Sequence, residues 1–219
     1  MKVAIDGPAG AGKSSIAKAV AKKMDFIYID TGAMYRAVAV YAIENGIEIK
    51  EENFTKDVLD KIKIDIAYED GTQKIFLSGK DVSERIREAD VSIGASNVAV
   101  IPAVRLKLVE LQRSLAEKTS VIMDGRDIGT YVLPKAEVKI FLTASSDVRA
   151  KRRLLEMEQK GMKADFETVK RDIEYRDKND SEREFAPLKQ AEDAILVDTS
   201  DMSIEEVIDR ISGIIKGGK

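Results

Sequence analysis

The chain of 219 residues contains no cysteine and no histidine. The absence of cysteine excludes disulfides, thiolate metal sites and a thiol nucleophile. The absence of histidine removes the side chain that most often serves as general base or metal ligand near neutral pH. Any chemistry must therefore depend on carboxylates, lysines, arginines, hydroxyl groups, backbone amides or a hard cation.

Long apolar runs are missing as well. No segment reaches the ~18 apolar residues that a transmembrane helix needs, and the first residues lack the apolar stretch of a signal peptide. We therefore expect a cytoplasmic protein with no membrane partner. The net charge of −3 gives no basic excess, so a nucleic-acid partner is not expected either.

What the sequence does contain is typical of a soluble globular protein, with 44% apolar and 34% charged residues. The length allows one domain with insertions or a core with small satellites. Short apolar runs predict strands over residues 2–6, 26–29, 120–123, 138–142 and 194–197. Helical patterns over residues 13–24 and 33–44 imply crossovers in a parallel sheet. The runs are continuous rather than alternating, which suits strands covered on both faces.

The middle of the chain departs from this rhythm. Residues 63–68 alternate between apolar and polar side chains, Asp70-Gly71 follows, and a second β-prone run covers residues 74–77. Asp-Gly between two such runs indicates a hairpin, so we expect an antiparallel insertion over roughly residues 53–91.

Two further helices complete the pattern. One begins at Pro102 and has an apolar face of Val104, Leu108, Leu111 and Leu115. The other covers residues 203–216, and we expect it to pack through Ile204, Val207, Ile208 and Ile211.

The segment between the first strand and the first helix matches the phosphate-binding pattern G-x-x-x-x-G-K-[ST]. Its residues are Gly7, Pro8, Ala9, Gly10, Ala11, Gly12, Lys13 and Ser14, followed by Ser15. Glycines let successive backbone N–H groups turn toward phosphate oxygens, and the helix N-terminus adds its positive end. Lys13 is expected to reach the β- and γ-phosphates of ATP, and the Ser14 hydroxyl to hold Mg²⁺.

A phosphate cradle alone leaves three classes open: a GTPase switch, a nucleotide-driven machine and a small-molecule kinase. The guanine-reading N-K-x-D of a GTPase is absent. Motor ATPases are usually longer chains with a pair of carboxylates at a strand end. A kinase needs a second, basic site that faces the cradle.

Candidate residues for that second site follow the third expected strand. Asp124 ends the strand, where parallel sheets place ligand groups, and it can orient Mg²⁺ or its water. Arg126 can contact phosphate, and Asp127 can accept hydrogen bonds. A capped turn with a local ion pair is the alternative for this stretch. Tyr35 and Arg36 open a helix after the second strand and, taken alone, could equally be ordinary surface residues.

A charged run over residues 174–189 also admits two interpretations. Such runs usually form a solvated helix face. Alternatively, Arg176, Asp180 and Arg183 lie about one helical turn apart because they close over something negatively charged.

Six motifs together resemble the bacterial-type cytidylate kinases, within the nucleoside monophosphate kinase family. They are the phosphate cradle, "DTGAMYR", "GASNVAVIPAVR", "DGRDIGT", "KIFLTASSDVRAKRR" and "RDKNDSEREFAPL". The resemblance covers essentially the whole chain in order, and "DGRDIGT" and the distal "APL" are its most specific parts. Within the charged run, Lys178, Asn179, Ser181 and Glu182 stand where family members vary.

The resemblance implies an α/β fold of the P-loop NTP-hydrolase type. A five-stranded parallel sheet flanked by helices would form the core over residues 1–30, 101–148 and 186–219. Residues 31–100 would form a nucleoside monophosphate-binding region that contains the antiparallel insertion, and residues 149–185 a helical lid. A monomer is expected.

The resemblance also implies site residues. The acceptors CMP and dCMP would be surrounded by Thr31, Tyr35, Arg36, Ser96, Arg105, Arg126, Asp127, Arg176, Asp180 and Arg183. Arg149, Arg152 and Arg153 would open the helix beneath the lid on the ATP side. Lys13, Arg126, Arg176 and Arg183 would be catalytic, with Ser14 and Asp124 holding Mg²⁺ through water.

Cytosine offers an amino donor at N4 beside acceptors at N3 and O2. Asp127 can accept from N4 while Arg105 donates to N3 or O2. Uracil would leave the carboxylate facing an oxygen, at a cost of about 1–3 kcal/mol for each buried mispaired group. CMP is therefore the expected acceptor. Two rivals are a broader UMP/CMP or monophosphate kinase and a nucleotide-gated binding protein without an acceptor.

Phosphoryl transfer to a nucleotide needs no general base, because the second pKa of the acceptor phosphate is ~6. Catalysis would consist of positioning and charge neutralisation, with a lid excluding water. From this pattern Arg183→Ala is expected to lower kcat by orders of magnitude while leaving the melting temperature nearly unchanged.

Overall fold

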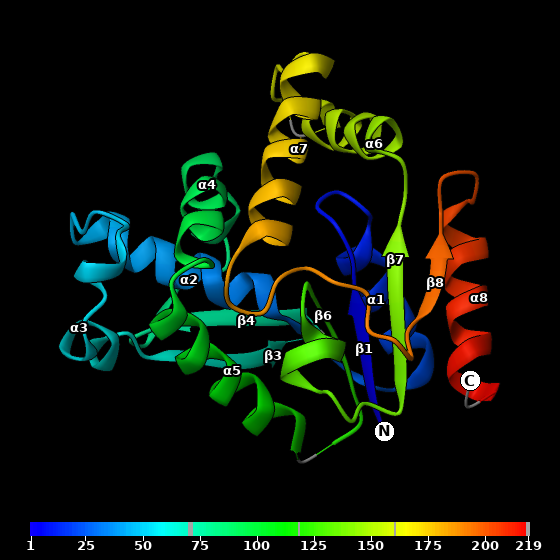
Figure 1. Ribbon diagram of the computed structural model, residues 1–219, viewed down its shortest axis with the longest axis horizontal. Coiled ribbons are helices and arrows are strands. Elements are labelled where there is room, and N and C mark those ends of the chain that lie inside the picture. Colours follow the sequence, from blue (N-terminus) through cyan, green and yellow to red (C-terminus); the bar gives the residue numbers. More distant parts are fainter. Residues whose placement is uncertain (70–71, 118, 160, 218–219) are drawn as a thin grey trace.

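The computed structural model describes residues 1–69, 72–117, 119–159 and 161–217. Its centre is a five-stranded parallel sheet in the order β2-β6-β1-β7-β8 (Figure 1). The strands are β1 (Lys2–Asp6), β2 (Ile27–Asp30), β6 (Val121–Gly125), β7 (Val138–Thr143) and β8 (Ile195–Asp198). All five expected strands are confirmed, with bounds that differ from the expected ones by at most two residues.

Helices cover both faces of this sheet. Successive residues of β1 point to opposite sides, so Val3 and Ile5 pack in one core while Ala4 packs in the other. The first core includes α1 (Lys13–Met24) and α8 (Ile204–Gly217), and the second includes α2 (Thr31–Glu44) and α5 (Pro102–Glu117). Burial on both faces explains why the strands read as continuous apolar runs.

Two details of the helices differ from expectation. α2 begins at Thr31 rather than at residue 33, because the carboxylate of Asp30 accepts a hydrogen bond from the Ala33 amide and caps the helix. In α8, Ile204 is 62% exposed, whereas Val207 and Ile211 are buried. Ile204 is therefore not part of the packing stripe, which begins about one turn after the start of the helix, at Val207.

The expected antiparallel insertion is present. β3 (Ile64–Glu69) pairs with β4 (Thr72–Leu77), and a short β5 (Lys80–Asp81), which the sequence pattern did not indicate, extends the sheet. The expected Asp70-Gly71 turn lies outside the described residues. The Gln73 side chain joins this sheet to the main one by accepting from the Asp30 amide, at 2.9 Å.

Short helices surround the insertion: η1 (Glu51–Asn53), α3 (Lys56–Lys61), η2 (Arg85–Arg87) and α4 (Ala89–Val98). Among the described residues no single helix has the length and apolar composition to cross a membrane. The pair α4 and α5 passes on those two criteria only when counted together across a 99° bend.

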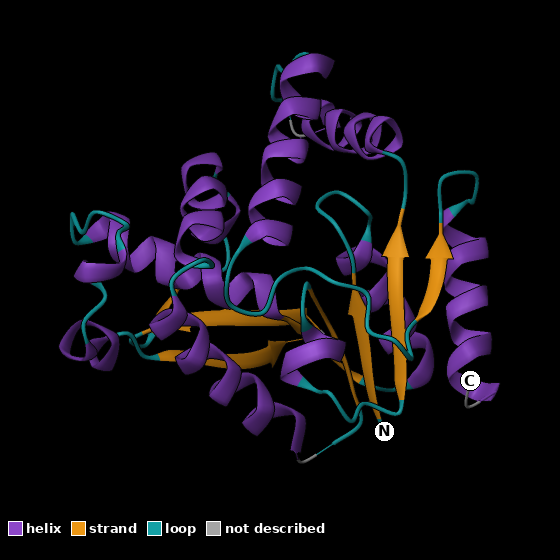
Figure 2. Ribbon diagram, in the orientation of Figure 1, coloured by secondary structure: helices purple, strands orange, loops and turns teal. Residues whose placement is uncertain are grey.

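A pair of helices, α6 (Ser146–Gln159) and α7 (Phe166–Glu182), lies beyond the carboxyl ends of the strands (Figure 1). The two helices share a small core of Ala150, Val169 and Ile173 that is separate from the two cores of the sheet. Figure 2 shows loops from several strands gathered at the same edge, beneath this helix pair. Parallel α/β sheets bind their ligands at this edge.

Candidate active site

The phosphate cradle joins β1 to α1. Gly7 has φ 152° and Gly10 has φ 73°, values that side chains rarely tolerate. A Cβ at Gly7 would lie 1.9 Å from the Leu142 carbonyl oxygen, so only glycine fits there. α1 has no side-chain cap and no acidic residue in its first turn, which leaves its N-terminal amides available to an anion.

Lys13 is buried at the start of α1, and its ammonium group donates to the Pro8 carbonyl at 2.7 Å. Burial lowers the pKa of Lys13 to about 7, and the nearby cation Arg126 adds to the effect. A buried cation with a depressed pKa favours a negatively charged ligand, because that ligand would restore the stability of the charged form.

Asp124 lies opposite Lys13 at the carboxyl end of β6. One of its oxygens accepts from the Ser14 hydroxyl and the other from the Tyr28 hydroxyl, both at 2.9 Å. Burial raises the pKa of Asp124 to about 6, and the neighbouring Asp30 acts in the same direction. Tyr28 holds the carboxylate in place, although nothing in the sequence pattern singled it out.

A group of cations lies between the cradle and α7. Arg126 donates to Asp180 at 2.6 Å. Burial disfavours the charge of Arg126, yet Asp180 keeps its pKa above the ordinary value. Arg176 has no hydrogen bond or ion pair among the described residues, and burial together with Arg126 and Arg36 lowers its pKa to about 10. Arg36 is likewise unpaired. The group therefore contains positive charges that no carboxylate of the described residues pairs with.

A second charged group lies beside the first. Asp127 accepts from Arg105 at 2.5 Å and from Arg183 at 3.0 Å. Arg105 is 1% exposed, and its guanidinium lies against the rings of Tyr35 and Phe185. Its Nε atom is buried without a hydrogen-bond partner. A carboxylate offers about four lone-pair sites, so Asp127 retains accepting capacity.

The burial of Arg183 changes the expectation for Arg183→Ala. The guanidinium also donates to the Ala186 carbonyl at 2.7 Å, and its side chain is 3% exposed. The substitution is therefore expected to lower the free energy of unfolding by about 1–3 kcal/mol, because hydrogen bonds to a charged group are lost. Thermal denaturation checks this: a melting temperature within 1 °C or so of the wild type would contradict it, since each kcal/mol corresponds to roughly 2–4 °C at this size.

The arginines of the expected ATP side are bound within the protein. Arg149 is buried and donates to Ala9 and Ala144 carbonyls, at 2.8 and 2.9 Å, and to Asp177. Arg152 donates to Thr199. Arg153 pairs with Glu156 at the surface. A direct contact of these arginines with ATP stays a prediction.

The remaining predicted residues lie around the acceptor side. The Thr31 hydroxyl is buried and donates to the Asp124 carbonyl at 2.7 Å. Burial raises the pKa of Tyr35 to about 12, so its hydroxyl is neutral at physiological pH. Ser96 is half-buried in the last turn of α4, just before the short loop that leads to α5, the helix of Arg105.

Asp6 was not among the predicted site residues. It ends β1, directly before the cradle, and accepts from the amides of Ile128 and Gly129 at 2.8 and 2.7 Å. Those amides open the π-helical turn η3 (Ile128–Val132), directly after Asp127. Burial raises the pKa of Asp6 to about 6 despite these bonds. Its position at a strand end was the available signal.

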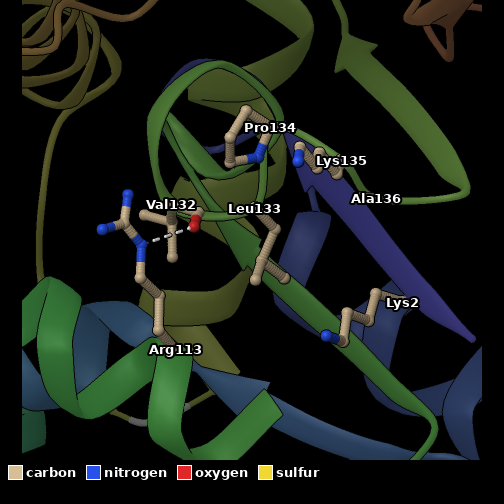
Figure 3. A pocket seen from close by; sticks show the side chains of 7 residues that line it. All are labelled: Lys2, Arg113, Val132, Leu133, Pro134, Lys135 and Ala136. Atoms are coloured by element: carbon tan, nitrogen blue, oxygen red, sulfur yellow. Dashed lines mark hydrogen bonds between the residues drawn. The ribbon is translucent and has the colours of Figure 1, made fainter. Parts of the chain in front are cut away.

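Two hollows lie outside this arrangement. One, of about 210 Å³, is lined by Lys2, Arg113, Lys135 and the segment 132–136. Its three cations point in different directions, and Arg113 donates to the Val132 carbonyl (Figure 3). The other, of about 440 Å³, is lined by Glu51, Val100, Pro102, Glu184 and Phe185. Neither contains the phosphate cradle.

Comparison with known sequences identifies the family. A protein-family model described as "Cytidylate kinase" matches residues 3–217. The chain belongs to the cytidylate kinase family. The family resemblance seen in the motifs is thereby confirmed, and the chain is a nucleotide-binding kinase of this family.

Curated members of the cytidylate kinase family align over nearly their whole length. A "Cytidylate kinase" of Lactobacillus gasseri is 52% identical over 216 residues, which are 99% of this chain and 94% of that protein. The "Cytidylate kinase" of Caldicellulosiruptor bescii is 51% identical, and the alignment covers 96% of this chain and 93% of that protein. The one of Bacillus thuringiensis is also 51% identical, with 99% of this chain and 96% of that protein covered.

Solved structures of distant proteins share the fold. An uncharacterized protein from Eubacterium ventriosum has a TM-score of 0.55 at 17% identity, with coverage of 99% of this chain and 98% of that one. A shikimate kinase from Bacteroides thetaiotaomicron has a TM-score of 0.50 at 14% identity and the same coverage. At such identities the likeness concerns the fold alone, and it agrees with the expected P-loop kinase architecture.

Proposed function

We propose that this member of the cytidylate kinase family transfers the γ-phosphoryl group of ATP to CMP and dCMP, giving CDP or dCDP and ADP. One observation carries the proposal: two partly buried arginines without a hydrogen bond or ion pair among the described residues, together with the buried Lys13, lie between a phosphate cradle and a separate carboxylate–arginine group. Among the described residues Arg36 and Arg176 form no hydrogen bond or ion pair, and Lys13 beside them has a depressed pKa. An acceptor phosphate and a transferring phosphoryl group would supply the missing negative charge.

The carboxylate–arginine group supports cytosine as the acceptor base. Asp127 is oriented by two arginines and can accept from the N4 amino group, while Arg105 has N–H groups left for N3 or O2. Asp180, held by Arg126, is suited to a ribose hydroxyl. Thr31, Tyr35, Ser96 and Arg183 complete the proposed acceptor side.

The donor set suits Mg²⁺. The Ser14 hydroxyl and the Asp124 carboxylate are hard oxygen ligands at the edge of the phosphate cradle, 2.9 Å apart. Among the described residues no cluster of three or more acidic side chains forms a cation cage. That fits an ion bound mainly through substrate phosphates and water. When bound, Mg²⁺ would neutralise charge on the β- and γ-phosphates.

The protein's own residues would act by position and charge. The cradle amides and Lys13 would hold the ATP phosphates, while Arg36 and Arg126 would orient the acceptor phosphate. Arg176 and Arg183 would meet the charge that spreads over the transferring group. No side chain needs to remove a proton, because the acceptor phosphate is already largely ionised at neutral pH. This accounts for catalysis without histidine.

The helix pair α6–α7 is the proposed lid. It has its own small core, and it carries Arg176, Asp180 and Arg183 over the cradle. We keep the division into a core of residues 1–30, 101–148 and 186–219, an acceptor region of residues 31–100 and a lid of residues 149–185. A cytoplasmic monomer without membrane or nucleic-acid partners is part of the same proposal.

An acceptor panel tests the function. CMP, dCMP, UMP and AMP are supplied at equal concentration with Mg-ATP, and steady-state rates are compared. CMP and dCMP are expected to be phosphorylated well, and UMP about 5- to 150-fold more slowly, since one mispaired group costs about 1–3 kcal/mol. Comparable turnover of UMP would contradict the role of Asp127. ATP hydrolysis that CMP does not stimulate would favour the binding-protein alternative.

Asp127→Asn is the matched variant for this panel. It keeps the shape of the side chain but places an NH₂ group beside a cytosine N4 donor. The ratio of kcat/KM for CMP to that for UMP is expected to fall toward 1. Asp193→Asn serves as a control of the same chemistry, because Asp193 is 66% exposed and pairs with Lys139, which has no role in the proposed site.

A further inference from the structure

The lid helix α7 contacts the phosphate cradle through a residue to which the proposed function assigns no role. The carboxylate of Asp177 accepts a hydrogen bond from the Ala9 amide at 2.8 Å. The same carboxylate accepts from Arg149 at 2.5 Å. Arg149 also donates to the Ala9 carbonyl at 2.8 Å, so both polar groups of this cradle residue are bound by the lid.

Burial makes these contacts significant. Ala9 is 1% and Arg149 7% exposed, and the Asp177 side chain is 22% exposed. Water therefore competes poorly for the Ala9 amide, and an unpaired buried amide would cost about 1–3 kcal/mol. A cradle amide that donates to Asp177 is also not free to bind phosphate, which leaves that task to the amides nearer α1.

Packing alone does not fix the lid over the cradle. The lid core of Ala150, Val169 and Ile173 is separate from the cores of the sheet. The lid helices pack closely against the cradle at Gly10. A Cβ added at Gly10 would lie 3.3 Å from both Arg149 Cβ and Ile173 Cδ1. The position of α7 along the cradle thus depends on directional polar contacts.

Asp177 also has a favourable position in α7. Arg176 precedes it directly, and Asp180 lies one turn further along the same side of the helix. A shift or rotation of α7 at Asp177 would therefore also move Arg176, which has no hydrogen bond or ion pair among the described residues. Misplacement by about 1 Å can cost on the order of 10²-fold in rate.

We propose that Asp177 is a positioning residue, which binds α7 to the cradle through Ala9 and Arg149 and thereby aims Arg176 at the transferred phosphoryl group. This proposal rests on the proposed function for its kinetic consequence. Its structural part, the protection of the Ala9 amide by Asp177, does not depend on the acceptor.

The test compares the wild type with Asp177→Ala, Asp177→Asn and the control Lys178→Ala in the full chain. Lys178 is the next residue on α7, its side chain is 68% exposed, and its ammonium group lies 3.9 Å from the exposed carboxylate of Glu182. Amide hydrogen exchange of Ala9 is measured by NMR without ligands. Steady-state kinetics are measured with CMP and ATP, each varied at saturating levels of the other.

We expect Asp177→Ala to speed exchange of the Ala9 amide at least about 10-fold and to lower kcat about 10- to 100-fold, with KM for ATP changed less than about threefold. Asp177→Asn still offers an acceptor to Ala9 but no charge to Arg149, so its kcat should lie between that of the wild type and that of Asp177→Ala. Lys178→Ala should match the wild type in both measurements.

Unchanged exchange at Ala9, or kcat within twofold of the wild type, would overturn the proposal. So would a raised KM for ATP at unchanged kcat, because Asp177 would then act in ATP binding. If Asp177→Ala does not fold, Asp177→Asn is judged by kcat alone, because the asparagine still offers an acceptor to the Ala9 amide: a kcat within twofold of the wild type would overturn the proposal. A wild-type protein that does not phosphorylate CMP would overturn the proposed function instead, while the exchange comparison would still decide whether Asp177 binds the cradle.

Discussion

Replacing Lys13 with methionine is expected to lower kcat for CMP phosphorylation by about 10³-fold, the range found when a preorganised charge is removed from a transferring group. Lys13 is the cation nearest the cradle, and it is buried with its ammonium on the Pro8 carbonyl. Methionine keeps most of the length of the side chain and removes the charge. The fold should survive, because burial already lowers the pKa of Lys13 to about 7 and the charge contributes little to stability there.

The measurement is kcat at saturating ATP and CMP, with circular dichroism to confirm folding. Lys22→Met, in the exposed last turn of the same helix, is the control and should leave kcat unchanged. A Lys13→Met enzyme with kcat within tenfold of the wild type would show that the cradle amides alone neutralise the phosphates.

Arg176→Ala is the second change with a large expected effect. Arg176 forms no hydrogen bond or ion pair among the described residues, and burial, reinforced by the neighbouring cations Arg126 and Arg36, lowers its pKa. Removing it therefore takes away repulsion in the ligand-free protein but also removes a charge that would meet the transferring phosphoryl group. We expect kcat to fall about 10³-fold and the melting temperature to stay the same or rise slightly.

Arg171→Ala is the matched control, since Arg171 lies on the exposed side of the same helix and contacts Thr168. Arg176→Lys should be intermediate, because lysine restores a point charge but not the planar fork of donors. A fall in melting temperature of several degrees for Arg176→Ala would mean that the arginine is structural, as Arg183 is in part.

The contrast between Arg176 and Arg183 illustrates what a charge pattern can and cannot predict. Both stand in the same charged run, and the sequence offered no reason to separate them. The structure pairs Arg183 with Asp127 and leaves Arg176 unpaired. The partner of Arg183, Asp127, lies far away in the sequence, two residues after β6. The spacing within the charged run could therefore not distinguish an unpaired arginine from a paired one.

The sequence by itself determined the local features: the phosphate cradle, the continuous apolar strands, the antiparallel insertion and the absence of histidine and cysteine. These follow from backbone permissiveness at glycine, from side-chain periodicity and from the chemistry of residue types, all of which act over a few neighbours. The family motifs predicted which residues would bind the acceptor.

Only the tertiary structure decided which groups are bound to one another. Asp6 binds the turn after Asp127 across 122 residues, Tyr28 binds Asp124 across 96, and Asp177 binds Ala9 across 168. A buried hydrogen bond depends on position in space and on exclusion of water, and neither is set by the local pattern around a residue. The parallel sheet brings its strand ends to one edge. Charged residues that are far apart in the sequence therefore lie together there and form a site suited to anions.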